Sequence, residues 1–191
     1  MEQKWVRRIL WIAVIAVCGL IFFFSAQSGE ESADTSGKVV EWLIAILIKG
    51  YHMLAAAQQQ EIFDTASLIV RKLAHFSEFA LLGFLVRLLM QSYQVKAGAS
   101  RAWVATSLYA VTDELHQLFS DARGASVVDV GIDSLGAAAG VGIACLLLWL
   151  ILTSRKAKGE APDNEASERT GFCCDTISST ERIIGLQEVN G

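Results

Sequence analysis

The chain has little charge and almost no proline for its length. Charged residues make up 19% of the 191 positions, 53% are hydrophobic, and there are one Pro and 15 Gly. A soluble domain of this size is rarely so apolar, and a collagen-like or disordered chain has a different composition. The formal net charge of −4 provides no basic field for nucleic acid. We therefore predict a membrane protein that has no nucleic-acid partner.

Cysteine is also scarce, and its positions exclude the common cysteine-based sites. Cys18 and Cys145 lie inside apolar runs, while Cys173 and Cys174 are adjacent in a polar segment. Neither arrangement has the spacing of a disulfide framework or of a four-ligand zinc site. We expect no chemistry from these thiols.

Long apolar runs predict four transmembrane helices, each close to the ~20 residues that cross the hydrocarbon layer. The predicted spans cover residues 9–24, 73–90, 102–118 and 130–152. Trp5 and Trp11 stand beside the first span, where interfacial aromatic anchors are common. A cleaved signal peptide is the alternative for this first run. It is disfavoured because the run is long and Phe-rich and lacks a small-x-small cleavage site.

The segment between the first two spans is polar except for residues 42–48. That stretch is too short to span a membrane. Lys38, Glu41 and Lys49 flank it and Tyr51 follows, which predicts a helix that lies in the interface or dips in re-entrantly. The predicted fold is an all-α integral membrane bundle of four transmembrane helices, with this extra helix in the first outer loop.

Small residues and a polar end distinguish the last part of the chain. Gly136 and Gly140 are four apart with three Ala between them, a spacing that lets membrane helices approach closely. We predict a packing face there.

Residues 1–153 are assigned to the transmembrane domain, and residues 154–191, which contain the only proline, to a flexible polar cytoplasmic tail.

Basic residues near the span ends predict the orientation. They lie before the first span, between the second and third, and after the fourth: Lys4, Arg7, Arg8, Lys96, Arg101, Arg155, Lys156 and Lys158. With four spans these three segments share one side, which the positive-inside rule assigns to the cytoplasm together with both termini. Arg87, near the cytoplasmic end of the second span, is expected to snorkel to the interface.

Ionisable residues gather at the opposite, outward end of the bundle. Arg71, His75 and Glu78 fall at i, i+4 and i+7 and share one helical face, with Lys72 beside them. The end of the third span, the next turn and the start of the fourth span carry Asp113, Glu114, His116, Gln117, Asp121, Arg123, Asp129 and Asp133. An ionised group near the membrane centre costs roughly 2.5 to 3.5 kcal/mol, so these side chains must face one another, water or the interface. We expect the basic groups to pair with some of the carboxylates.

Four motifs in this order resemble the VanZ-like family of bacterial membrane proteins. They are Ser25-Ala-Gln27-Ser28, Arg71-Lys-Leu-Ala-His75-Phe-Ser-Glu78-Phe, Thr112-Asp113-Glu114-Leu-His-Gln117, and Arg123-Gly124 followed by Asp129. The resemblance covers roughly residues 9–152. Asp133 stands where the family usually has Asn. The resemblance implies a multi-pass protein of the bacterial cytoplasmic membrane with a role in the cell envelope, and the family is named for a member associated with teicoplanin resistance. It implies no particular reaction.

One reading of the polar cluster is a pocket at the outer leaflet. Arg71, Lys72 and Arg123 would hold a phosphate or carboxylate head group by charge-assisted hydrogen bonds. The further candidate ligand-binding residues are Gln117, Asp129, Ser25, Gln27 and Ser28. A membrane lipid, a lipid-linked wall precursor or an amphiphilic antibiotic fits this description.

Two other readings remain open. In a catalytic one, a hydrolase or transferase that acts on a lipid phosphate, His75 or one of Glu78, Asp113 and Glu114 acts as general base or metal ligand. The cationic groups would stabilise developing negative charge. The candidate ligands come from different helices and lack HExxH-type spacing, so we predict neither a metal nor a cofactor. No Gly-x-Ser-x-Gly elbow supports a serine hydrolase. In a passive reading, the polar cluster only holds the helices together by hydrogen bonds.

Overall fold

The computed structural model describes residues 2–25, 29–119 and 126–157, and this part of the chain is all-α, as predicted. The elements in order are α1 (Glu2–Ser25), α2 (Gly29–Leu47), the short 3₁₀ helix η1 (Tyr51–Met53), α3 (Ala56–Ser92), α4 (Gly98–Phe119) and α5 (Val127–Ala157). Most of the predicted tail lies outside the described residues, so its flexibility stays a prediction.

Three of the described helices are long and apolar enough to cross a membrane. These candidate spans are Gln3–Ser25, Ala56–Ser92 and Val127–Arg155, in α1, α3 and α5. Their outer surfaces expose large apolar side chains, such as Ile12 at 68% and Leu135 at 66%. Continuous apolar surface of this kind needs lipid around it. The predicted fourth crossing, α4, is not among the three, so the four-span count stays a prediction.

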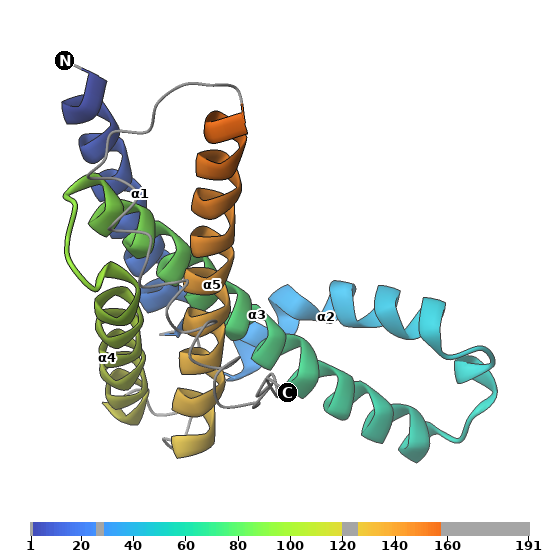
Figure 1. The fold of residues 1–191 in the computed structure, drawn as a ribbon. Helices are drawn as coiled ribbons and strands as arrows, with labels where there is room; N and C mark the ends of the chain where they lie inside the picture. The colour runs from blue at the N-terminus through green and yellow to red at the C-terminus, as the bar shows by residue number, and fades with distance from the viewer. Residues whose placement is uncertain (1, 26–28, 120–125, 158–191) are drawn as a thin grey trace, which may run out of the picture.

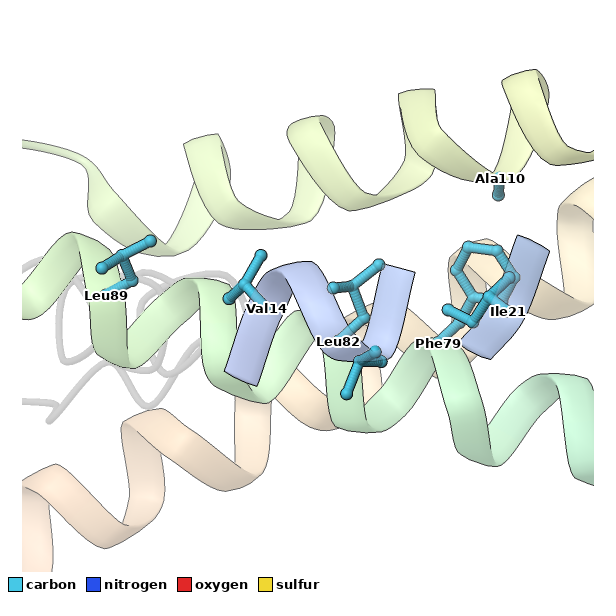
Figure 2. Close-up of a cluster of buried hydrophobic side chains, with 7 residues drawn as sticks. Val14, Ile21, Phe79, Leu82, Leu89 and Ala110 are labelled. Carbon is cyan, nitrogen blue, oxygen red and sulfur yellow. The ribbon is translucent and has the colours of Figure 1, made fainter. Parts of the chain in front are cut away.

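Helix α3 lies at the centre of the bundle and contacts α1, α2, α4 and α5 (Figure 1). Figure 2 shows the apolar core where α1, α3 and α4 meet. Ile21 from α1, Phe79 and Leu82 from α3 and Ala110 from α4 are almost completely buried there. Inside a membrane, such packing stabilises helix association through close van der Waals contact, because lipid is as apolar as the core.

The closest helix contact joins α3 and α5. A Cβ atom added at Gly136 would collide with the backbone oxygen of Phe76, and one added at Gly140 would collide with that of Ala80. Only glycine lets the two backbones approach so closely. The predicted packing face of small residues is therefore confirmed.

Helices α3 and α5 run in the same direction along the bundle. Lys72 near the middle of α3 pairs with Asp129 in the first turn of α5, and the Nε atom of Arg87 further along α3 lies 3.4 Å from the Cys145 sulfur further along α5. At the far end of the bundle, Arg7 of α1 donates hydrogen bonds of 3.1 and 2.7 Å to the carbonyl oxygen that ends α3. The start of α1 and the end of α3 therefore share one end, which Figure 1 shows together with the end of α5.

The expectation that Arg87 snorkels to the interface is wrong. Its side chain is only 5% exposed, and its guanidinium donates a 2.9 Å hydrogen bond to the amide oxygen of Gln91, one turn later on the same helix. Because α4 begins beside this point, with Gly98 close to the guanidinium, the charged end is enclosed by the bundle.

Helix α2 and the first half of α3 form an arm that extends sideways from the bundle (Figure 1). Val40 and Ile44 of α2 are buried, whereas Trp42 and Leu47 are 63% and 74% exposed. Helix α3 begins at Ala56, well before the predicted start of the second span at residue 73. Its 37 residues measure about 55 Å at 1.5 Å per residue, longer than the ~30 Å hydrocarbon core. The residues predicted at the entrance of a span therefore lie in the middle of a continuous helix.

Candidate functional site

A cavity of about 240 Å³ lies between α3, α4 and α5. It is at the end of the bundle where α4 finishes and α5 begins, opposite the N-terminus of α1. Six of the predicted site residues line it: Arg71, Lys72, His75, Glu114, Gln117 and Asp129. Leu68 and Ile132 add apolar wall, and Asp133 completes the lining. The volume suits a polar head group better than a drug-sized molecule.

Helical spacing explains why these side chains meet. On α3, Arg71 and His75 are four residues apart, and on α5 the same spacing separates Asp129 from Asp133. Residues four apart lie one above the other on the same helix face. The glycine contact that begins at Gly136 brings these two faces together. The backbone packing of α3 and α5 therefore builds two walls of the cavity.

Two charge contacts lie along the α3 side of the site. The Lys72 ammonium pairs with the Asp129 carboxylate, and the two side chains remain 46% and 41% exposed. The His75 Nδ1 atom lies 3.8 Å from the nearer carboxylate oxygen of Glu78. The expected pairing of basic and acidic groups is thus present for Lys72.

A second group of polar side chains makes hydrogen bonds inside the protein, although the Oδ1 atom of Asp113 has no hydrogen-bond partner among the described residues. Asp113 is 3% exposed and accepts a 3.2 Å hydrogen bond from the side-chain amide of Gln117, and the buried Ser25 at the end of α1 lies beside it. The Glu114 carboxylate accepts a hydrogen bond from the backbone N–H of Ser126, just before α5. These contacts tie the ends of α1 and α4 to the start of α5.

Two buried polar atoms at the cavity have no hydrogen-bond partner in the part of the chain that the structure describes. They are the Nε donor of Arg71 and the Oδ1 acceptor of Asp133. Asp133 is 4% exposed and lies within electrostatic reach of four other carboxyl groups. Burial of a polar atom without a hydrogen bond costs about 1 to 3 kcal/mol of stability, so a hydrogen bond to either atom would be stabilising.

The remaining predicted site residues do not line the cavity. Glu78 and Asp113 lie next to it, close enough to each other to interact electrostatically. Ser25 is fully buried behind Asp113. Gln27, Ser28 and Arg123 fall outside the described residues. Within the described ranges, no set of three His, Cys, Asp or Glu side chains is placed to hold a metal ion.

Asp133 is the charged residue in the described lining of this cavity that was not predicted as a site residue. Its spacing of four from Asp129 placed it on the same helix face, so the signal was present in the sequence. Spacing does not reveal that Asp129 has a basic partner on α3 whereas the buried oxygen of Asp133 has none. That distinction depends on the packed helices.

The fold and the site together define a helical membrane protein with a polar, charge-lined cavity at one end of its bundle. The family model described as VanZ/LLP1 matches residues 10–151, and the chain belongs to this family. The predicted family and the predicted extent of the resemblance are thereby confirmed. No curated protein and no solved structure shows significant similarity to the chain.

Proposed function

We propose that the protein binds an amphiphilic component of the bacterial cell envelope, with the head group in the cavity between α3, α4 and α5. In this proposal α4 is a fourth crossing, both termini are cytoplasmic and the cavity opens at the outer leaflet of the cytoplasmic membrane. The basic segments at the other end of the bundle support this orientation.

The observation that carries the proposal is the unsatisfied Arg71 Nε atom in a cavity of head-group size. Arginine binds phosphate and carboxylate through several donors at once, and such charge-assisted bonds are strong where water is scarce. The neighbouring Lys72 is 46% exposed and paired with Asp129, and its ammonium adds positive charge beside Arg71.

Apolar surface next to the cavity supports an amphiphile over a purely polar ligand. Leu68 lines the cavity and exposes 54% of its surface, and the neighbouring Ile69 and Leu73 are 54% and 59% exposed. Ile69 and Leu73 share one helix face because they are four residues apart, and in this proposal they extend an apolar path from Leu68 along the outside of α3. Acyl or prenyl chains would lie along this path while the head group enters the cavity.

Binding of an envelope amphiphile would explain a role in glycopeptide resistance of the teicoplanin type. Such drugs act outside the cytoplasmic membrane, and a protein that sequesters or shields a lipid component there would change the access of a lipid-bearing drug to its target. This step is part of the proposal and follows from the family resemblance.

The passive alternative, in which the polar cluster only assembles the bundle, has support for some residues. Asp113, Glu114 and Gln117 all have contacts within the protein that serve assembly. Arg71 Nε and Asp133 Oδ1 are not explained in this way. Both classes of residue are therefore compared in the test.

The test is the change Arg71→Gln in the full-length protein, with Arg101→Gln on exposed α4 surface at the other end of the bundle as the matched control. We expect Arg71→Gln to weaken binding of phosphatidylglycerol about tenfold or more, because charge-assisted hydrogen bonds are lost. The melting temperature in detergent and the affinity of the control should stay unchanged. Equal lipid affinity in both variants would contradict the proposal, and loss of the folded protein on Arg71→Gln would favour the passive alternative.

A further inference from the structure

The proposed function uses the basic wall of the cavity and leaves Asp133 without a role. This carboxyl group lies on the α5 wall, is 4% exposed, and its Oδ1 atom has no hydrogen-bond partner in the described parts of the chain. A hydrogen-bond donor from a ligand would stabilise a carboxylate oxygen in this position.

The charges around the cavity are unequal. Three carboxyl groups line the cavity, those of Glu114, Asp129 and Asp133, and those of Glu78 and Asp113 lie next to it. Among the described residues, Arg71 and Lys72 are the permanently charged basic ones that line it. A ligand with only negative charge would add to this excess, whereas a ligand that also has a positive group would reduce it.

Internal contacts already occupy the other acids that line the cavity. Asp129 pairs with Lys72, and Glu114 accepts the backbone N–H of Ser126. Asp133 differs from both because its buried oxygen has no such contact among the described residues. Among the acids of the described lining, Asp133 is therefore the one whose buried oxygen would gain a hydrogen bond from a positive group of a ligand.

We propose that the ligand is zwitterionic, with a phosphate or carboxylate bound by Arg71 and a primary ammonium bound by Asp133 across the same cavity. This inference rests on the proposed function and names the chemistry of the head group. A primary ammonium donates N–H bonds to the Oδ1 acceptor, which a quaternary ammonium cannot do. A phospholipid with a primary amine in its head group has this chemistry, and so does free phosphoethanolamine.

The test measures binding of three phospholipids with identical acyl chains to the purified full-length protein. Phosphatidylethanolamine has both groups, phosphatidylglycerol has only the anion, and phosphatidylcholine has a quaternary amine. We expect phosphatidylethanolamine to bind about tenfold more tightly than either of the others. Free phosphoethanolamine is included as a competitor. If it competes at an affinity equal to that of the lipid, the same chemistry is supported and the ligand is assigned to a soluble source.

The change Asp133→Asn removes the charge and keeps the shape. We expect it to abolish the preference for phosphatidylethanolamine and to leave phosphatidylglycerol binding equal or stronger. Asp64→Asn is the matched control, because Asp64 is an exposed carboxylate on α3 outside the cavity. It should leave the order of lipids unchanged.

The outcomes separate this inference from the proposed function. Equal affinity of the unaltered protein for phosphatidylethanolamine and phosphatidylglycerol, both weakened by Arg71→Gln, would overturn the zwitterion and keep the proposed function. Absence of binding of all three lipids would overturn both. The comparison of lipids on the unaltered protein decides the matter even if Asp133→Asn does not fold.

Discussion

Neighbouring polar residues at this site differ in whether their buried atoms have hydrogen-bond partners within the protein. Asp113 and Glu114 are adjacent in sequence, both are buried, and each accepts a hydrogen bond from the protein itself. The Oδ1 atom of Asp113 has no partner among the described residues, but Asp113 does not line the cavity. Arg71 and Asp133 come from different helices and each presents a buried atom that no described residue satisfies. A polar residue that is satisfied internally serves assembly, whereas one left unsatisfied at a cavity points to a ligand.

The Lys72–Asp129 pair should add little to stability. Both side chains are nearly half exposed, and exposed ion pairs contribute about 0 to 1 kcal/mol. In a double-mutant cycle of Lys72→Met and Asp129→Asn, measured by reversible unfolding in detergent, we expect a coupling free energy below about 1 kcal/mol. A coupling of several kcal/mol would show that this pair is a structural lock of the bundle.

At the scale of the elements, the contact between α3 and α5 determines the shape of the site. Glycine at positions 136 and 140 lets the backbones touch, and the cavity begins where this contact ends toward the start of α5. Any side chain that separates the two helices should therefore change stability and the site together.

The change Gly140→Ala tests this contact. The added methyl group would collide with the backbone oxygen of Ala80, which has no flexible end that can move away. We expect a loss of about 1 to 3 kcal/mol in unfolding free energy, typical of overpacking. The matched control is Gly142→Ala on the same helix, where an added Cβ meets nothing within 4 Å. An equal effect of the two changes on the melting temperature would contradict the close contact.

The sequence predicted the existence of most helices and missed the true beginning of α3. Hydropathy defines the apolar part after residue 73, but residues 56–72 are mixed in polarity and gave no signal of a membrane span. Helix α2 packs on α3, with Gly37 close to the Phe63 ring, and Val40 and Ile44 of α2 are buried. A tertiary contact of this kind cannot be inferred from a local window.

For the whole molecule, the distribution of basic residues bears on which side of the membrane the cavity faces. Arg7, Lys96 and Arg155 lie toward the end of the bundle opposite the cavity, and by the positive-inside rule our proposal places the cavity on the outside. The proposed ligand and the link to drug access depend on this orientation.

Cysteine labelling tests the orientation. In a variant without the native cysteines, we expect Asp64→Cys on the arm to react with a membrane-impermeant maleimide in intact cells. Lys96→Cys, between α3 and α4, should react only after the membrane is opened. Both positions are exposed, so access to the reagent depends on the side of the membrane. The reverse labelling pattern would place the cavity in the cytoplasm and contradict the proposed function.

The amino-acid sequence by itself determined the all-α class, the family and the small-residue face of α5, because hydropathy, motif order and glycine spacing are local properties of the chain. Only the tertiary structure decided which polar residues line the cavity. The rotation and register of α3, α4 and α5 set the burial and the partners of each charge. For this reason Asp133 lines the cavity, whereas Glu78 and Asp113 lie beside it.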